Sequence, residues 1–221
     1  MKDYSVDCDG YTAEKPQYVR VEKYLDLQKK YNDLKKSVFK PSLIGLCGAA
    51  GSGKTTVAKI LMDDHAFVRT RFAEPMKAMI RALLVYANFD PAEVEQMVDG
   101  ALKERVLPEL NFKSPRFAMQ TLGTEWGREH LGRNIWVDLT MRNVRELLDQ
   151  VSASVVIDDV RFPNESEAIR KAGGRVLRVM RDHDAIPESA HKSETQLLEF
   201  DGCIINTGSM SELKLQIQNN I

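Results

Sequence analysis

The stretch from Leu43 to Thr56 constrains the fold of this 221-residue chain more than any other part. It reads LIGLCGAAGSGKTT, which is an apolar run, a glycine-rich turn and a helix start, and it fits the pattern G-x-x-x-x-G-K-[ST]. Glycines allow a tight turn whose backbone N–H groups point at anionic oxygens, and the positive end of the helix dipole strengthens that field. The pattern therefore predicts a strand, a phosphate-binding loop and a helix in succession.

The residue types in this loop indicate how a nucleoside triphosphate would be held. Lys54 supplies a charge beside the β- and γ-phosphates, and the hydroxyl of Thr55 is a ligand for a Mg²⁺ ion that bridges two phosphates. The expected cofactor-binding residues of the loop are Gly48, Gly51, Gly53, Lys54, Thr55 and Thr56. The alternative is a strand-to-helix turn without a ligand, in which the additional glycines would carry an entropic cost without a use.

Composition and charge narrow the class of protein. Hydrophobic residues make up 43% and charged residues 29% of the chain, and a formal net charge of −1 provides no field to attract nucleic acid or an acidic membrane. The 3 cysteines lie far apart, which suits a reducing cytosol, and no apolar run approaches a membrane span. The 4 histidines lack metal-ligand spacing. We expect a cytoplasmic protein with no nucleic-acid or membrane partner and no metal site made by protein residues alone.

The chain divides near Pro41 into an N-terminal extension, residues 1–40, and a main domain, residues 41–221. Residues 1–15 are polar and turn-rich, and we expect poor order there. Residues 17–38 carry apolar side chains at helical spacing, which predicts an amphipathic helix. Such a helix would either pack on the domain or pair with a second copy as a short coiled coil, which makes a homodimer one alternative.

Apolar runs and helical patterns alternate through the main domain. Strands are expected near 43–47, 67–72, 154–157, 175–180 and 203–205, and helices near 54–63, 76–89, 92–97, 115–122, 135–148, 165–172, 193–200 and 211–217. Strands separated by helices predict an α/β fold of three layers, with a parallel sheet between two layers of helices. Ligands of such sheets bind at the carboxyl ends of the strands, where the phosphate loop also lies.

The end of the third expected strand carries a second group of functional candidates. Apolar residues 155–157 deliver Asp158 and Asp159 toward the expected Mg²⁺, but successive strand residues point to opposite faces, so the two carboxylates cannot do the same work. Arg161 is suited to stabilising a migrating phosphoryl group, with Glu165 to orient it. The alternatives are aspartates that cap a turn and a solvated Arg161–Glu165 pair. One of the two aspartates is expected to join Thr55 on the metal, with Asp158 as the candidate and the choice between Asp158 and Asp159 left open, and Lys54, Arg161 and Glu165 are expected to act in catalysis.

The helical stretch between the second and third strands contains basic, amide and aromatic side chains. A phosphorylated acceptor needs Arg or Lys for its own phosphate, and its base needs an amide edge or an aromatic face. The candidates are Lys77, Arg81, Arg116, Gln120, Arg128 and Trp136, each of which is alternatively a surface charge or a core aromatic. Arg178 and Arg181, at the end of the fourth strand, are expected to cover the triphosphate as a lid, while Ser193 is expected to cap a helix.

Several longer motifs are more specific than the phosphate loop: FAEPMK at 72–77, RFAMQTLGTEWGR at 116–128, NIW at 134–136, DDVRFPNE at 158–165 and HKSE at 191–194. Through them, residues 42–215 resemble bacteriophage deoxynucleoside monophosphate kinases. The resemblance implies an adenylate-kinase-like P-loop fold with a five-stranded parallel sheet and a helical acceptor-binding region over 73–136. It also implies transfer of the γ-phosphoryl group of Mg²⁺-bound ATP to a deoxynucleoside monophosphate, in an infected host cell if the protein is phage-encoded.

The resemblance also implies roles for individual residues. It places Asp159, Arg161 and Glu165 in a catalytic motif, and it places five residues in the acceptor-binding region: Arg116, Gln120, Gly123, Thr124 and Trp136. Two departures limit what transfers: Glu74 stands where the family usually has Asp, and residues 1–40 have no counterpart.

Two other functions fit part of the pattern. A kinase for another phosphorylated acceptor, such as phosphomevalonate, would share the scaffold and a similar strand-end motif. A nucleotide-switched ATPase or binding module would use the loop to drive binding, and it would hydrolyse ATP without an acceptor. The sequence leaves open which bases are accepted and how deoxyribose is distinguished from ribose.

Overall fold

The computed structural model describes residues 5–6, 12–13, 26–27, 29–30, 41–181 and 199–221. The chain separates into two units, Met1–Lys40 and Pro41–Ile221. In the first unit, β1 (Ser5–Val6) pairs antiparallel with β2 (Thr12–Ala13), so part of the stretch expected to lack order forms a two-stranded sheet. Residues 26–27 and 29–30 are helical, and the rest of the helix predicted over 17–38 lies outside the described residues. The helix predicted over 193–200 also falls mostly outside them.

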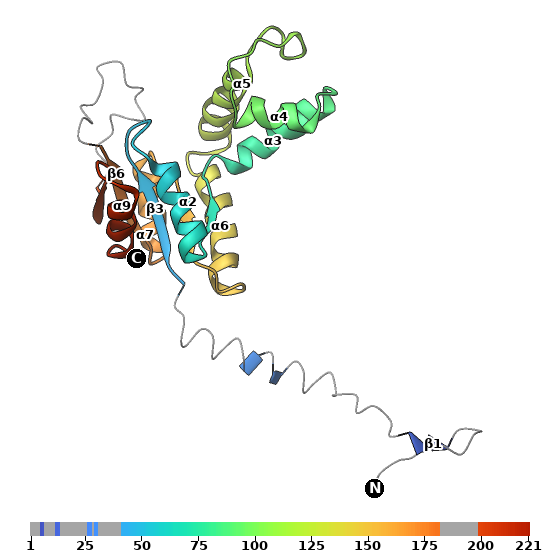
Figure 1. Cartoon of the computed structure of the whole chain (residues 1–221). Helices are drawn as coiled ribbons and strands as arrows, with labels where there is room; N and C mark the ends of the chain where they lie inside the picture. The colour runs from blue at the N-terminus through green and yellow to red at the C-terminus, as the bar shows by residue number, and fades with distance from the viewer. Residues whose placement is uncertain (1–4, 7–11, 14–25, 28, 31–40, 182–198) are drawn as a thin grey trace. The chain divides into compact units, whose positions relative to one another are not determined.

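The second unit is built on a five-stranded parallel sheet in the order β4–β5–β3–β6–β7 (Figure 1). The strands are β3 (Leu43–Cys47), β4 (Val68–Thr70), β5 (Val155–Ile157), β6 (Arg175–Met180) and β7 (Gly202–Ile205). The predicted sheet is confirmed. Its central strand β3 is buried at every position because helices cover both faces, which explains why the strand is a continuous apolar run.

Helices cover the two faces of the sheet in pairs. One layer holds α2 (Lys54–His65) and α9 (Met210–Gln218), and the other holds α6 (Ile135–Asp149) and α7 (Pro163–Lys171). Because side chains alternate along a strand, Ile44 and Leu46 join the core under α2 and α9, whereas Leu43 and Cys47 join the core under α6 and α7. Gly45 lies under α7, where an added Cβ would stand 2.5 Å from Cδ1 of Ile169.

The stretch between β4 and β5 forms a helical insertion with a core of its own (Figure 1). It contains α3 (Glu74–Tyr86), α4 (Pro91–Val98), the 3₁₀ turn η1 (Pro108–Leu110), α5 (Pro115–Thr121) and the π-helix η2 (Leu122–Leu131), which continues directly from α5. The starts of α4 and α5 were predictable, because the side chains of Asp90 and Ser114 accept hydrogen bonds from backbone N–H groups of the first turn. The π-helix was not predicted, since the α-helical pattern was expected to stop at Gly123.

Parallel strands bring all of the following loops to one edge of the sheet. The phosphate loop follows β3, Arg71 follows β4, Asp158 follows β5, Arg181 follows β6 and Asn206 follows β7. Residues from five separate parts of the sequence therefore gather at this edge. Among the described helices, none is both long and apolar enough to cross a bilayer.

Candidate active site

The phosphate loop is shaped by glycines in backbone conformations that other residues rarely adopt. Gly48, Gly51 and Gly53 have φ values of 141°, 80° and 106°. A Cβ on Gly48 would lie 2.3 Å from the carbonyl oxygen of Val179, and one on Gly53 would lie 2.2 Å from Nδ2 of Asn206. The loop is therefore packed directly against the ends of β6 and β7, and glycine is required at both positions.

The side chain of Lys54 lies across its own loop. Its Nζ donates hydrogen bonds to the carbonyl oxygens of Gly48 at 2.8 Å and Ala49 at 2.7 Å. Ser52 is fully buried, and its carbonyl oxygen accepts a hydrogen bond from Nδ2 of Asn206 at 3.0 Å. Thr55 is exposed at the start of α2, and Thr56 is partly exposed. The loop is therefore folded, with the ammonium group of Lys54 against its carbonyl oxygens and the side chain of Thr55 exposed at the start of α2.

The two aspartates after β5 have different partners, as their positions on opposite faces predict. Asp158 is 6% exposed and forms ion pairs with Arg69 and with Arg71, the latter at 3.3 Å from Nε to Oδ1. Both of its oxygens therefore accept from guanidinium groups at the end of β4. A metal role for Asp158 remains a prediction, and it would require these ion pairs to open.

Asp159 holds the turn that leads into α3. Its Oδ1 accepts a hydrogen bond from the backbone N–H of Phe72 at 2.8 Å, and its Oδ2 accepts one from Ala73 at 3.0 Å. Burial raises the pKa of this carboxyl, although the two N–H donors favour the charged form. The side chain thus fixes the position of the insertion relative to the sheet, and its predicted catalytic role stays a prediction.

Glu165 connects the strand-end motif to the insertion. It is 1% exposed, and its Oε2 accepts hydrogen bonds from the backbone N–H groups of Arg161 at 2.7 Å and Phe162 at 3.0 Å. Its Oε1 accepts from Arg128 at 3.0 Å, and the guanidinium of Arg128 lies 4.0 Å from the centre of the Phe162 ring. Burial raises the pKa of Glu165. Glu165 therefore acts on Arg161 through the backbone, while the Arg161 side chain is exposed.

Three basic side chains from the end of β4 and from α3 meet at Asp99. Its carboxylate accepts from Arg71 at 2.8 Å, Lys77 at 2.5 Å and Arg81 at 2.8 Å. Desolvation acts to raise the pKa of Asp99, but the hydrogen bond and charge of Lys77, together with Arg71, leave the pKa lowered. Lys77 was expected here, whereas Arg71 and Asp99 were missed. The alternation of basic and apolar residues over 67–72 was a usable signal, because it places Arg69 and Arg71 on one side of β4.

The remaining acceptor candidates on α5 and η2 are spread over the surface of the insertion. Arg116 forms an ion pair with Glu104, and its side chain is 47% exposed. Gln120 and Thr124 are exposed. The structure does not bring these three side chains into contact with Asp99 or Glu165, so their acceptor roles remain predictions.

The tryptophan expected to face the acceptor is part of the core. Trp136 is 4% exposed, and its Nε1 donates to the carbonyl oxygen of Gly123 at 2.8 Å. A Cβ on Gly127 would lie 2.4 Å from the Trp136 ring, so the indole packs directly on the π-helix backbone. Trp126, which sequence reasoning did not select, is 42% exposed, with its ring centroid 6.3 Å from that of Trp136. Trp126 is therefore the accessible one of these two tryptophans.

Both arginines of the predicted lid, Arg178 and Arg181, lie within the described residues, which stop at Arg181 and resume at Glu199. Arg178 is placed with its guanidinium 5.5 Å from the centre of the Phe200 ring. Arg181 is exposed at the end of β6. A role for either arginine over the triphosphate remains a prediction.

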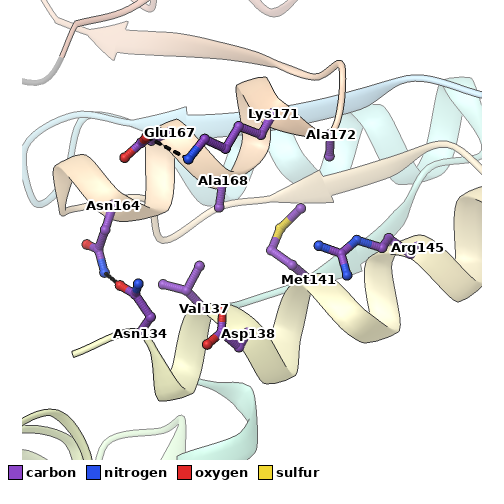
Figure 2. A pocket seen from close by; sticks show the side chains of 10 residues that line it. All are labelled: Asn134, Val137, Asp138, Met141, Arg145, Asn164, Glu167, Ala168, Lys171 and Ala172. Carbon is purple, nitrogen blue, oxygen red and sulfur yellow. Dashed lines mark hydrogen bonds and ion pairs between the residues drawn. The ribbon is translucent and has the colours of Figure 1, made fainter. Parts of the chain in front are cut away.

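Figure 2 shows a separate groove of about 230 Å³ between α6 and α7, on the face of the sheet away from α2. The side chains of Val137, Met141 and Ala168 lie between the two helices. Asn134 and Asn164 form a hydrogen bond of 2.8 Å at one end, and Lys171 pairs with Glu167 at 2.8 Å. The lining mixes both charges without a set of groups that converge on a ligand, so we assign it no substrate.

Comparison with known proteins decides which class of enzyme this site serves. A family model described as deoxynucleotide monophosphate kinase matches residues 80–217. The chain belongs to that family. A mimivirus protein (Acanthamoeba polyphaga mimivirus) named as a deoxynucleotide monophosphate kinase is 30% identical over 195 residues, which cover 79% of this chain and 93% of the relative.

Two phage enzymes are more distant relatives of this deoxynucleotide monophosphate kinase. The deoxynucleoside-5'-monophosphate kinase of Escherichia phage T5 is 27% identical over 183 residues, covering 58% of this chain and 72% of the relative. The deoxynucleotide monophosphate kinase of Enterobacteria phage T4 is 25% identical over 237 residues, covering 81% and 98%. The protein is a kinase that transfers a phosphoryl group from a nucleotide donor to a deoxynucleoside monophosphate, and nothing favours phosphomevalonate or a nucleotide-switched ATPase.

Proposed function

We propose that the phosphate donor is ATP and that the loop from Gly48 to Thr55 holds its phosphates. The single observation that supports this assignment is the geometry of the loop, in which three glycines with positive φ end at the first turn of α2 with Lys54 at the centre. Lys54 would leave the carbonyl oxygens of Gly48 and Ala49 and move to the β- and γ-phosphates, which are stronger acceptors for an ammonium group.

A Mg²⁺ ion carried by ATP fits one side of this site. The exposed Thr55 hydroxyl at the start of α2 is a suitable oxygen ligand, whereas Asp158 is ion-paired with two arginines. Among the described residues, no group of three or more His, Cys, Asp or Glu side chains is placed to hold a metal. When bound, Mg²⁺ would neutralise charge on the phosphates. Thr55 is accordingly the protein residue that we assign to it.

The acceptor would bind between the end of β4 and the insertion. Its own phosphate requires cations, and Arg71, Lys77 and Arg81 are half-buried side chains that meet there. The base would lie along α5 and η2, where Gln120 offers an amide edge and Trp126 an aromatic face. Arg116 and Arg128 remain candidates for polar contacts with the acceptor.

The chain's own residues would act by position and charge. The acceptor phosphate is already a nucleophilic oxyanion, so no strong general base is needed. Lys54 would follow the migrating phosphoryl group from the donor side, and the exposed Arg161 would approach it from the turn that Glu165 fixes. Asp159 would keep α3 in register with the sheet through Phe72 and Ala73. Alignment and exclusion of water would then supply most of the rate enhancement.

One assay tests the proposal directly. The full-length chain is incubated with ATP and Mg²⁺ and with each deoxy- and ribonucleoside monophosphate in turn, and ADP release is followed. We expect ADP release that depends on a deoxynucleoside monophosphate and disappears when EDTA removes the metal. Equally fast conversion of the deoxynucleoside monophosphate to its diphosphate with GTP or CTP as donor would contradict the choice of ATP. Release without any acceptor would contradict kinase chemistry at this site.

The N-terminal unit requires its own test. We propose that residues 1–40 contribute to assembly as a homodimer and that the enzyme acts in the cytoplasm, where nucleotide pools are found. Sedimentation of the full-length chain against a chain that starts near Val38 compares the two masses. If both proteins sediment with the same number of chains per particle, residues 1–40 have no role in assembly.

A further inference from the structure

The arrangement around Asp99 resembles a bound phosphate. Its Oδ1 accepts from Nη1 of Arg71 at 2.8 Å and from Nζ of Lys77 at 2.5 Å, and its Oδ2 accepts from Nη2 of Arg81 at 2.8 Å. The three donors come from the end of β4 and from two turns of α3, while Asp99 follows the last residue of α4. Arg and Lys surround phosphate groups with the same charge-assisted hydrogen bonds.

The two arginines do not depend on Asp99 for their positions. Nε of Arg71 also donates to Asp158 at 3.3 Å. Arg81 donates from Nη1 to Glu74 at 2.7 Å and from Nε to Glu95 at 2.7 Å. If the Asp99 carboxylate left the cluster, both guanidinium groups would keep a partner and would stay available to another anion.

Asp99 is placed to leave the cluster. Its side chain is 29% exposed, compared with 4% for Asp158, which lies behind Arg71. It belongs to a turn over residues 99–104 rather than to a helix. The pKa of Lys103, in the same turn, is lowered mainly by desolvation. The charge of Asp99 acts to raise this pKa, whereas repulsion from the nearby cations lowers it further; these cations are Lys77, Arg116 and Arg71. The surroundings of Asp99 are therefore crowded with positive charge.

We propose that Asp99 occupies the acceptor-phosphate position before the substrate binds and is displaced by the substrate's phosphate, so that Asp99 sets the affinity for phosphorylated acceptors. This assignment rests on the proposed acceptor site. A nucleoside monophosphate carries close to two negative charges at neutral pH and can replace a single carboxylate, whereas an unphosphorylated nucleoside has no group that competes with Asp99. Asp99 would thus weaken the binding of phosphorylated acceptors and leave the binding of nucleosides unaffected.

The test compares Asp99→Asn with Glu93→Gln in the full-length protein. Glu93 lies on α4, which ends just before Asp99, pairs with Arg105 and is 34% exposed, so its variant removes one acidic charge without touching the cluster. Binding of the four deoxynucleoside monophosphates, and of thymidine and deoxyadenosine, is measured by calorimetry. We expect Asp99→Asn to bind the monophosphates about tenfold more tightly (~1.4 kcal/mol), to lower KM without raising kcat, and to leave nucleoside binding unchanged.

The other outcomes separate the inference from the function on which it rests. Unchanged or weaker monophosphate binding in Asp99→Asn, with Glu93→Gln equal to the wild type, would show that Asp99 only organises the cations and would overturn the proposal. If the wild type neither binds nor phosphorylates any of the four monophosphates, the proposed function itself fails. Should Asp99→Asn not fold, as judged by its melting temperature, Asp99→Ser carries the same expectation.

Discussion

The proposed donor and acceptor sides of this enzyme are built in different ways. The phosphate loop is eight consecutive residues, and its shape depends on backbone conformation at three glycines. The proposed acceptor side is built from side chains brought together by the fold: Arg71 and Asp99 are 28 residues apart, and Arg128 and Glu165 are 37 apart. The family match over residues 80–217 excludes the phosphate loop and covers most of the insertion. The residues that would hold the triphosphate are therefore neighbours in the sequence. The residues that would hold the acceptor, most of which the family model matches, are brought together only by the fold.

The largest expected effect tests the donor side. Lys54→Ala should reduce kcat by roughly a thousandfold or more, because it removes the charge that follows the transferred phosphoryl group. Its Nζ donates hydrogen bonds to two carbonyl oxygens of its own partly buried loop, so the fold should persist. ADP release and circular dichroism measure the two quantities. Near-normal turnover in a folded Lys54→Ala variant would show that the phosphate loop does not take part in phosphoryl transfer as proposed.

The second prediction compares two tryptophans of the acceptor side. Trp136→Ala should lower the free energy of unfolding by about 3–5 kcal/mol, because the ring is buried against the π-helix. Trp126→Ala should have a small effect on stability, because its ring is 42% exposed, and should raise KM for the acceptor. Urea denaturation and steady-state kinetics distinguish the two. If Trp126→Ala lowers the free energy of unfolding as much as Trp136→Ala does, the view that Trp136 is structural and Trp126 contacts the acceptor is wrong.

The third prediction concerns the connection between the two sides. Glu165→Gln leaves the Arg128 charge without its carboxylate, and we expect a loss of about 2–3 kcal/mol, reduced from the fully buried case because the Arg128 side chain is 21% exposed. Glu167→Gln on the same helix breaks a solvated pair with Lys171 and is the matched control, with no measurable change expected. Chemical denaturation of both variants checks this. If the two variants have the same free energy of unfolding, Glu165 does not connect the turn after β5 to the insertion.

The fourth prediction compares two glycines in the phosphate loop. Gly51→Ala meets no neighbour, so its cost is backbone strain of about 1–2 kcal/mol. Gly48→Ala adds a contact of 2.3 Å with the Val179 carbonyl oxygen, and overpacking should contribute roughly 1–3 kcal/mol more. Melting temperatures and ATP titrations of both variants measure the difference. The same cost at both positions would mean that close packing against β6 does not shape the loop.

The smallest expected effect is a pH dependence. The pKa of Glu165 is raised above its ordinary value of 4.5, so the folded state binds this proton more tightly than the unfolded chain does. The stability contributed by the protonated form is complete below about pH 4.5 and declines as pH rises through the folded-state pKa. Glu165→Gln lacks this decline, so the difference in unfolding free energy between wild type and variant should narrow as pH rises above about 4.5, which urea denaturation at a series of pH values measures. A difference that widens as pH rises would contradict the raised pKa.

Local sequence patterns were enough to predict most of the fold and the proposed donor site. The strand near 43–47, the glycine loop and the caps at Asp90 and Ser114 are decided by neighbours in sequence, and they were predictable for that reason. Arg71 and Asp99 were missed because only the packing of β4, α3 and α4 brings them together. For Trp136 the sequence left two alternatives, an acceptor contact and a core aromatic, and the burial of the ring against Gly127, which depends on the packing of α6 on η2, could not be predicted from either segment alone.

Gly45 links the middle of the sheet to the turn that follows β5. Because Gly45 lacks a side chain, Ile169 of α7 and Val160 of that turn lie close to the backbone of β3, and an added Cβ would stand 2.5 Å from Cδ1 of Ile169 and 3.0 Å from Cγ2 of Val160. A single methyl group at this buried position would push both neighbours away from β3. Asp158 and Asp159 would then be displaced, although neither residue is itself changed.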